Sequence, residues 1–407
     1  MYAEATGEPE STDLAPGDRA VNDLFSQRCA DDPHTVYHEV QDTCPVHRAP
    51  GMFGGNAVHI SSYEDVRWAL RHPEVFSSKD VVNLGGAPLI PLSVDPPEHA
   101  KYRRMLDPEF SPKKMLALEP EARELVNQLI DKFTAKGECE FNDDFATPLP
   151  STIFLALLGL PQSDLPDFLE WRDDTIRPQG DTIEETERKR QAAGESIERY
   201  FVNALEEKRK NPDDRLLTRI ARGEVDGRPL TDAEQLGMCH LLLIAGLDTV
   251  TATLDCMITY LAQHPDRRQA VVDDPDLMEP VIEELLRHQT PVMMLPRVIA
   301  QDHQLGDVQM TAGDSATLMI GAANCDRGEF DDPSDVQLDR TANRHLAFGG
   351  GPHRCLGSHL ARMELKVALQ EFHKRIPVYA IAEGTEVHFS PGIRQADHLP
   401  LVFPVAK

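Results

Sequence analysis

The most constraining feature of this 407-residue chain is the segment FGGGPHRCLG at residues 348–357. Its glycines allow a tight loop around one sulfur atom, because several conformations of such a loop are costly for a residue with a Cβ. The pattern that follows predicts a helix from Leu356 to Arg375, ended by Pro377. Cys355 would then lie near a helix N-terminus, where partial positive charge favours the thiolate that binds metals. The segment therefore predicts a thiolate ligand for a haem iron.

The bland alternative is that this cysteine is a small buried hydrophobic side chain. The fixed offsets of its aromatic, glycine and histidine neighbours make a chance match rare. The segment resembles the cysteine-ligand loop of the cytochrome P450 family, which reads Phe-Gly-x-Gly-x-His-x-Cys-x-Gly. The resemblance implies haem b as the cofactor, with Cys355 as the axial ligand of its iron. It also implies that the following loop residues contact the haem: Phe348, Gly349, His353, Cys355 and Gly357.

Composition argues against several classes of protein. A formal net charge of −27 opposes nucleic-acid binding, because phosphates would be repelled. No apolar run approaches the length of a membrane span, and no charged-then-apolar leader is seen. The seven cysteines are scattered without metal-site or disulfide spacing, which fits a reducing compartment. We therefore expect a soluble cytoplasmic bacterial enzyme without a membrane anchor.

Periodicity predicts a mainly helical chain with a small β part. Residues 1–19 are polar and acidic, which predicts a mobile arm. The resemblance implies that residues 20–407 form one catalytic domain with the family's triangular shape, the haem lying between a long distal helix and the cysteine loop. Helices are expected at 98–106, 113–134, 148–158, 165–176, 183–210, 277–289 and 356–375, and one long helix at 233–263 after a Thr231–Glu234 capping box. Strands are expected at 52–61, 297–300, 303–310, 315–320 and after Val387.

The middle of the long helix carries the sequence Ala245-Gly246-Leu247-Asp248-Thr249. Glycine and aspartate are unfavourable inside a helix, so both need a reason. The bland alternative is a threonine that only bonds back to the i−4 carbonyl. The resemblance implies instead that this element crosses the distal haem face, with Ala245 and Gly246 against the cofactor. It implies Thr249 as a hydroxyl donor beside the bound oxygen and Asp248 as the gate for proton delivery.

Two further sets of charged residues match family positions. Glu284 and Arg287 form an i, i+3 pair that is commonplace on any helix. The resemblance implies that they form a structural core pair, completed by an arginine further on, with Arg340 favoured over Arg344. Haem carries two propionates, which need cations or donors at fixed places. The resemblance assigns this role to His99, Arg103, Arg297 and His353.

Basic residues cluster around these elements despite the acidic total. Such a patch on the cysteine side of the molecule would attract an acidic electron carrier and speed its docking. We expect this carrier to be an iron–sulfur ferredoxin, which receives electrons from NAD(P)H through a reductase. The bland alternative is a solvated charged face. The candidate residues of the partner face are Arg104, Lys113, Arg344, Arg354 and Arg362.

The candidate substrate pocket is apolar and rich in methionine, which suits a terpenoid, steroid-like or fatty-acyl molecule. The resemblance is to the soluble camphor-hydroxylase-like group, yet Ala87 offers no hydrogen bond where the camphor enzyme has an anchoring tyrosine. Arg394 is out of place among apolar neighbours, so it either points outward or meets a polar substrate group. The pocket candidates are Val82, Leu84, Leu89, Leu243, Leu247, Met293, Met294, Leu295, Ile393 and Arg394.

These features together predict a haem-thiolate monooxygenase that inserts one oxygen atom of O2 into a C–H bond. A first alternative is a peroxide-driven fatty-acid hydroxylase, in which an arginine replaces the acid–hydroxyl pair; Asp248 and Thr249 oppose it. A second is a haem-binding sensor or carrier without catalysis, which has no use for a proton-delivery pair.

Overall fold

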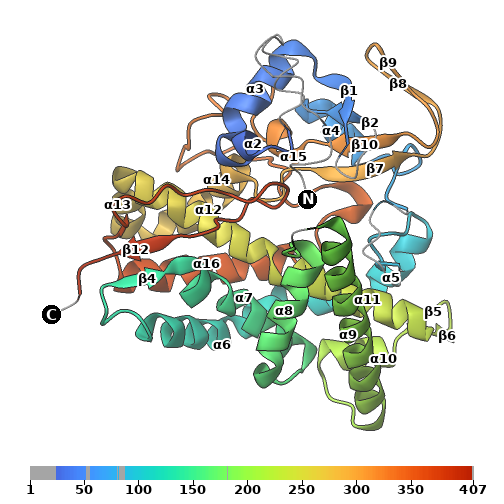
Figure 1. Ribbon diagram of the computed structural model, residues 1–407, viewed down its shortest axis with the longest axis horizontal. Coiled ribbons are helices and arrows are strands. Elements are labelled where there is room, and N and C mark those ends of the chain that lie inside the picture. Colours follow the sequence, from blue (N-terminus) through green and yellow to red (C-terminus); the bar gives the residue numbers. More distant parts are fainter. Residues whose placement is uncertain (1–23, 52–55, 80, 82–87, 181, 406–407) are drawn as a thin grey trace.

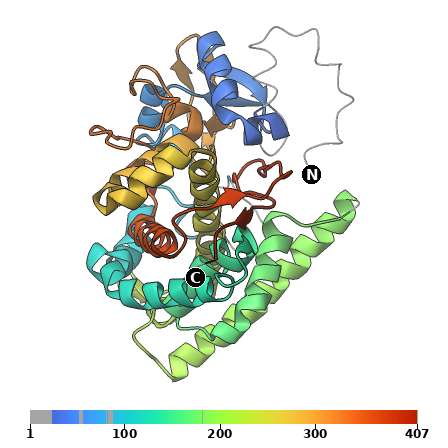
Figure 2. The same ribbon diagram turned by 90° about the vertical axis from the view of Figure 1, so that its left-hand side faces the viewer.

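The computed structural model describes residues 24–51, 56–79, 81, 88–180 and 182–405. The expected arm at 1–19 and the pocket candidates Val82 and Leu84 lie outside these residues. Helices fill most of the molecule, and the largest sheet lies at one end (Figures 1 and 2). The predicted mainly α fold with a small sheet is confirmed.

The expected helices are all present, most of them with ends within three residues of the predictions. The helices are α2 (Gln27–Asp31), α3 (Pro33–Thr43), α4 (Tyr63–Ala69), α5 (Glu98–Leu106), α6 (Pro112–Asp131), α7 (Pro148–Leu158), α8 (Leu165–Ile176), α9 (Ile183–Lys210), α10 (Leu216–Ala221), α11 (Asp232–Leu247), α12 (Thr249–Gln263), α13 (Pro265–Asp273), α14 (Met278–Gln289), α15 (Ile320–Ala323) and α16 (Ser358–Arg375). A short π-helix, η3 (Asn142–Ala146), precedes α7.

The predicted long helix at 233–263 is wrong in one respect, because it is divided in two at Asp248. Asp248 has φ −120° and ψ −35°, outside the helical range, and it separates α11 from α12. The N-terminus of α11 is the predicted capping box. The Thr231 hydroxyl accepts from the Glu234 N–H at 3.2 Å, and the Glu234 carboxylate accepts from the Thr231 N–H at 2.7 Å. Residues 232–263 are long and apolar enough to span a membrane, but most of this stretch is buried, as expected of a core helix.

The main sheet joins the N-terminal and C-terminal halves of the chain. Its order is β1-β2-β10-β7-β3, in which β10 runs parallel to β2 and the other neighbours are antiparallel. A three-stranded sheet has the order β11-β12-β4, and β5–β6 and β8–β9 are hairpins. The strands are β1 (Val46–Pro50), β2 (Asn56–Ile60), β3 (Phe76–Ser77), β4 (Glu138–Glu140), β5 (Glu224–Val225), β6 (Arg228–Pro229), β7 (Leu295–Ile299), β8 (His303–Leu305), β9 (Val308–Met310), β10 (Ser315–Leu318), β11 (Ala380–Ile381) and β12 (Pro400–Val402).

The strand expected after Val387 is only partly present. Its regular part is β12, whereas residues 389–396 form a turn held by two isolated bridges, Phe389 with Ala396 and Val292 with Ile393. The expected strand at 303–310 is a hairpin, because Gly306 turns the chain with a φ of 57°. The turn at 389–396 brings the C-terminal segment against the residues that precede β7.

Candidate active site

The cysteine loop is fixed by backbone contacts that require glycine. Gly349 and Gly351 have φ values of 65° and 62°, which are costly for other residues. A Cβ on Gly351 would lie 2.1 Å from the carbonyl oxygen of Leu70, so no larger residue fits there. The Cys355 N–H donates to the Phe348 carbonyl at 2.9 Å and closes the loop. The loop therefore holds the sulfur at a defined place just before α16.

The Cys355 side chain is accessible to solvent although protein atoms surround it densely. A side chain that is accessible and yet densely surrounded by protein atoms is one that faces a recess in the protein. Burial raises the pKa of the Cys355 thiol above its ordinary value, whereas an N–H bond from Gly357 and the charges of Arg103, Arg354 and Arg362 lower it. Coordination to a metal would deprotonate such a thiol outright.

A stripe of accessible side chains runs along α11 to the first residue of α12. Leu241, Ile244 and Thr249 are partly accessible and Ala245 is exposed, although most of the helix is buried. The Thr249 hydroxyl donates to the Ala245 carbonyl at 3.1 Å, as the bland alternative for this threonine expects. Gly246 is also partly accessible, but a Cβ added to it would meet the Phe154 ring of α7 at 2.6 Å. Its small size therefore serves helix packing.

Asp248 is fully buried and forms an ion pair with Arg177, the residue that follows α8. The Arg177 side chain is 27% exposed, so it links the buried carboxylate with the surface. The second oxygen of Asp248, Oδ2, has no hydrogen-bond partner among the residues that the structure describes. No local pattern predicts the role of Arg177, because its contact with Asp248 spans 71 residues of chain.

The four expected propionate-binding residues come from three separate segments. His99 of α5 and His353 of the loop lie with ring centroids 4.2 Å apart. Burial lowers the pKa of His99 to about 4 and that of His353 to about 3, so both rings are neutral at pH 7. Arg297 of β7 is buried, and its recorded hydrogen bond goes to the Pro296 carbonyl. Arg103 bonds Asp107 at 2.7 Å and the Arg354 carbonyl at 2.8 Å, which ties α5 to the loop.

These residues fit haem b. Burial lowers the pKa of Arg297 to about 10, and in the described part of the chain this cation has no carboxylate within ion-pair distance. The Nε2 atom of His353 is buried, makes no hydrogen bond within the described residues and lies 4.0 Å from Asp95. A propionate would satisfy both groups. The accessible sulfur of Cys355 and the open surface of Ala245 suit the two faces of a porphyrin.

Behind the loop, Glu284 and Arg287 form a fully buried pair at 2.8 Å. Arg340 also bonds Glu284, at 3.0 and 3.1 Å, whereas Arg344 pairs with Glu329 at the surface. Arg340, and not Arg344, is therefore the arginine that completes the Glu284–Arg287 pair. Sequence reasoning missed further donors to the Glu284 carboxylate: the Gln337 N–H at 3.0 Å and the Asn343 amide at 3.1 Å.

The pocket candidates divide into accessible and buried side chains. Leu295 and Ile393 keep partly accessible surface. Leu243 and Leu247 are fully buried in a cluster with α7 and α9 residues, so they expose nothing to a ligand. In this part of α11, the accessible side chains are instead those of Leu241, Ile244 and Ala245. Three more candidates are almost fully buried: Leu89, Met293 and Met294.

Arg394 does not point outward, which corrects that reading of its role, and it bonds other parts of the protein. It is 6% exposed, and its guanidinium donates to the Ala30 carbonyl at 2.7 Å and to the Gln289 side chain at 2.5 Å. The Phe389 ring lies 3.9 Å from it in a cation–π contact. Arg394 therefore fastens the 389–396 turn, with the adjacent Ile393, to α2 and α14.

Replacing Arg394 with methionine is expected to lower the free energy of unfolding by about 1–3 kcal/mol. The change leaves the Ala30 carbonyl and the Gln289 amide oxygen buried without their donor. Urea unfolding of the purified protein measures the change. A midpoint equal to that of the unchanged protein would show that this clamp contributes nothing.

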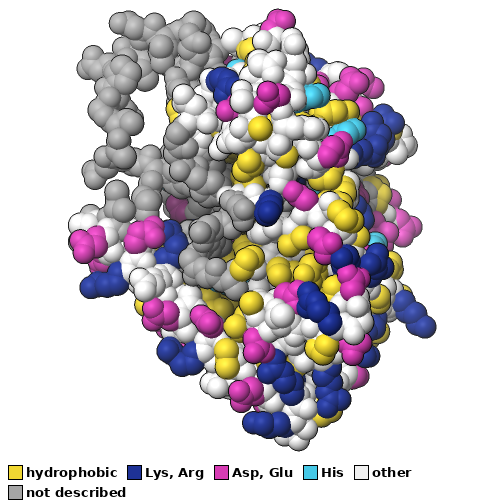
Figure 3. Space-filling model, turned by 90° about the vertical axis from the view of Figure 1, so that its right-hand side faces the viewer, with side chains coloured by type: hydrophobic (Ala, Val, Ile, Leu, Met, Phe, Trp, Pro, Cys, Tyr) yellow, Lys and Arg dark blue, Asp and Glu magenta, His cyan; other side chains and the backbone are white. Residues whose placement is uncertain are grey.

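The candidates for the partner face differ in their pairing. Arg344 and Arg362 are engaged by Glu329 and Glu283. Arg104, Lys113 and Arg354 are exposed, and no ion pair of theirs is found within the described residues. On the face that bears α5, basic and acidic side chains are interspersed around apolar ones rather than forming a uniform patch (Figure 3).

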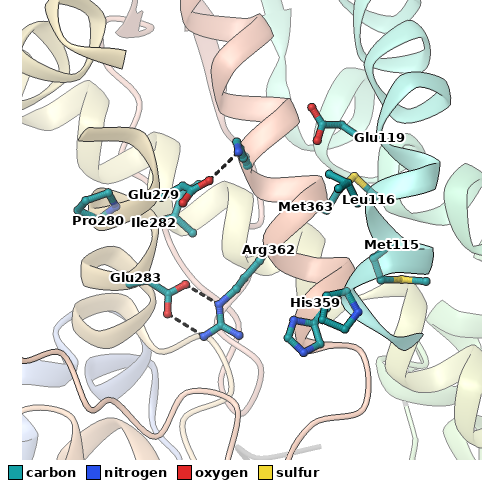
Figure 4. Close-up of a pocket in the computed structure, with 12 residues that line it drawn as sticks. Met115, Leu116, Glu119, Glu279, Pro280, Ile282, Glu283, His359, Arg362 and Met363 are labelled. Atoms are coloured by element: carbon teal, nitrogen blue, oxygen red, sulfur yellow. Dashed lines mark hydrogen bonds and ion pairs between the residues drawn. The ribbon is translucent and has the colours of Figure 1, made fainter. Parts of the chain in front are cut away.

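A surface hollow of about 560 Å³ lies between α6, α14 and α16, next to the cysteine loop (Figure 4). Arg362 crosses it to Glu283 with two bonds of 2.6 and 2.7 Å. Leu116 on its edge is 65% exposed. The hollow thus combines an apolar floor with paired charges. None of the residues assigned above to haem binding lines this hollow.

Comparison with known proteins agrees with this geometry. The family described as cytochrome P450 matches residues 23–376. Probable cytochrome P450 127A1 of Sinorhizobium fredii is 34% identical, with 87% of this chain and 86% of that protein covered. Mycinamicin IV hydroxylase/epoxidase of Micromonospora griseorubida is 32% identical, with 90% and 94% covered. The crystal structure of CYP109E1 from Bacillus megaterium in complex with testosterone has a TM-score of 0.85 and 28% identity, with 93% of this chain and 100% of that chain covered. The chain therefore belongs to the cytochrome P450 family and is a haem-thiolate monooxygenase.

Proposed function

We propose that this enzyme hydroxylates an apolar small molecule, of the terpenoid, steroid-like or fatty-acyl class, with O2 and two electrons from NAD(P)H. The observation that carries the proposal is the accessible stripe at Ala245, which is lined by leucine, isoleucine and threonine on helices that are otherwise mostly buried. The names of two similar proteins, a mycinamicin hydroxylase/epoxidase and a testosterone complex, support apolar substrates of some size. Residues 20–407 are proposed as one catalytic domain of a cytoplasmic protein.

Each site residue has a proposed task. Cys355 binds the haem iron, and the loop glycines and Phe348 keep the sulfur in place. Arg297, His353, His99 and Arg103 hold the propionates. When bound, haem supplies the redox chemistry that activates O2. The chain must then exclude bulk water and bring protons to the distal side.

Proton delivery is proposed to run through Asp248 and Thr249. Asp248 forms an ion pair with Arg177, and Arg177 reaches the surface. When Arg177 moves away, the Asp248 carboxylate takes a proton from solvent and passes it toward the Thr249 hydroxyl. The Thr249 hydroxyl lies on the accessible stripe, so it is the last protein group on this route.

Replacing Asp248 with asparagine is expected to lower the turnover number by about 10²-fold or more, since the amide cannot carry a proton. Substrate binding, measured by the haem spin-state shift, is expected to be unchanged. Arg177→Gln is the companion variant, and it is expected to speed proton uptake and flatten the pH profile. Turnover of Asp248→Asn at the unchanged rate would remove Asp248 from the route.

A small iron–sulfur ferredoxin is the proposed electron donor, itself reduced by NAD(P)H through a reductase. Arg104, Lys113 and Arg354, which form no ion pair with another described residue, are the cations proposed to attract its acidic surface. Reversing Arg104 and Arg354 to Glu is expected to slow reduction by ferredoxin at least about tenfold at low ionic strength. Arg188→Glu on α9 is the matched control. Equal rates for both variants would contradict the proposed face.

The function is tested by a screen of apolar ligands for a haem spin-state shift, followed by turnover with a reconstituted ferredoxin system. We expect product with one oxygen atom from O2 and consumption of NAD(P)H. Turnover supported by peroxide alone at physiological levels would favour the peroxide-driven alternative. A protein that binds haem but consumes no oxygen with any ligand or donor would favour a sensor or carrier.

A further inference from the structure

Asp255 is a second acidic residue buried in the distal helix, and the roles proposed above do not use it. It is fully buried in α12, and its Oδ2 accepts from the Asn142 amide at 2.5 Å. Its Oδ1 has no hydrogen-bond partner among the described residues. An ionised carboxylate with one neutral donor is costly to bury, whereas a protonated carboxyl is not. The geometry thus places a proton on Oδ1.

The charged groups around Asp255 agree with the protonated form. Burial raises the pKa of Asp255 well above its ordinary value, and the negative charges of Asp248 and Glu140 raise it further. The Asn142 bond and the Arg177 charge act in the opposite direction. Asp255 is therefore influenced by the charges of the same Asp248–Arg177 pair that links the interior with the surface.

Asp248 is the N-cap residue of α12 and Asp255 follows it by seven residues, so the two lie near one face of α12. Seven residues make two turns, about 10 Å along the axis and nearly the same direction around it. Thr251 lies between them, three residues after Asp248 and four before Asp255, and such neighbours have Cβ atoms about 5–6 Å apart. Its hydroxyl is fully buried and donates to the Ala146 carbonyl of η3 at 3.0 Å. The buried Asp248 Oδ2, also without a described partner, is at the other end of this row.

We propose that Asp255 stores a second proton for the reaction and passes it through the Thr251 hydroxyl to Asp248. The Asp255 Oδ1 proton moves to the Thr251 oxygen as that hydroxyl turns and releases its own proton to Asp248 Oδ2, with ordered water bridging either gap. The Asp255 carboxylate left behind takes a proton from solvent by the reverse route when Arg177 opens. Reducing O2 to water and an inserted oxygen atom consumes two protons, and Asp248 can carry only one at a time. This inference rests on the proposed function.

The variant Asp255→Asn tests proton storage without removing the structural role of the side chain. The amide keeps the size, the neutral charge and the acceptor oxygen of the protonated carboxyl, but it has no proton to transfer. The first readout needs no turnover. The infrared difference spectrum of holoenzyme minus Asp255→Asn at neutral pH is expected to show the carbonyl band of a protonated carboxylic acid. Absence of that band would overturn the inference.

The second readout is coupling, meaning product formed per NAD(P)H consumed, with peroxide release measured alongside. Asp255→Asn and Thr251→Val are each expected to lower coupling several-fold, and the double variant no further than either alone. Thr259→Val, which removes a buried hydroxyl one turn beyond Asp255, is the control and is expected to couple normally. Normal coupling in Asp255→Asn would overturn the inference. A wild-type protein with the acid band but no turnover would instead contradict the proposed function.

Discussion

Purified Cys355→Ala protein is expected to lose monooxygenase activity completely and to hold haem weakly or not at all. Cys thiolate is the axial haem ligand of this family, and His353, the other loop side chain that could bind iron, packs against His99 instead. Alanine fits the same backbone, because the Cys355 N–H bond to Phe348 is independent of the side chain. The fold should therefore survive, and circular dichroism with haem titration measures both effects.

Cys44→Ala is the matched control for this prediction. Cys44 is a partly exposed thiol at the end of α3, where it donates to the Val46 carbonyl, far from the loop in sequence. It is expected to bind haem and turn over as the unchanged enzyme does. A Cys355→Ala protein that kept both activity and its haem would show that another residue binds the iron.

Glu284→Gln is expected to cost about 3–5 kcal/mol of unfolding free energy, the usual result of removing one partner from a buried ion pair. The carboxylate accepts from two arginines: Arg287 is fully buried and Arg340 is 7% exposed. A neutral amide would leave both cations without their counter-charge. Because Asn343, which donates to Glu284, lies just before the cysteine loop in the chain, haem retention is expected to fall with stability.

The neighbouring Glu283→Gln provides the comparison. Glu283 also bonds an arginine, Arg362, but both side chains are about one-third exposed, so the loss is expected to be about 1 kcal/mol or less. Urea unfolding of the two variants gives the difference directly. Equal midpoints for Glu284→Gln and Glu283→Gln would contradict a structural role for the buried pair.

Local signals in the sequence predicted much of this molecule. Helix periodicity located α5 to α9, α14 and α16, and the capping box located the start of α11. The Glu284–Arg287 pair could be predicted because the two residues are three positions apart in the chain. The cysteine loop was legible because its glycines, histidine and cysteine are consecutive in the chain.

The residues whose exposure or contacts were predicted wrongly are those whose surroundings come from distant segments of the chain. α11 is apolar on almost every face, so periodicity could not tell that Leu241 and Ile244 are accessible while Leu243 and Leu247 are buried. Arg394 meets the Ala30 carbonyl across 364 residues, and Arg177 meets Asp248 across 71. Local sequence patterns cannot predict such contacts. Each contact gives a buried charged group its hydrogen-bond partner.

The central claim, a thiolate bond from Cys355 to haem iron, is tested most directly by the absorption spectrum of the reduced carbon-monoxide complex of the purified enzyme. This account predicts the red-shifted Soret band that a thiolate opposite the carbon monoxide produces. A band at the shorter wavelength typical of histidine or neutral-thiol ligation, in protein that is still folded, would contradict it.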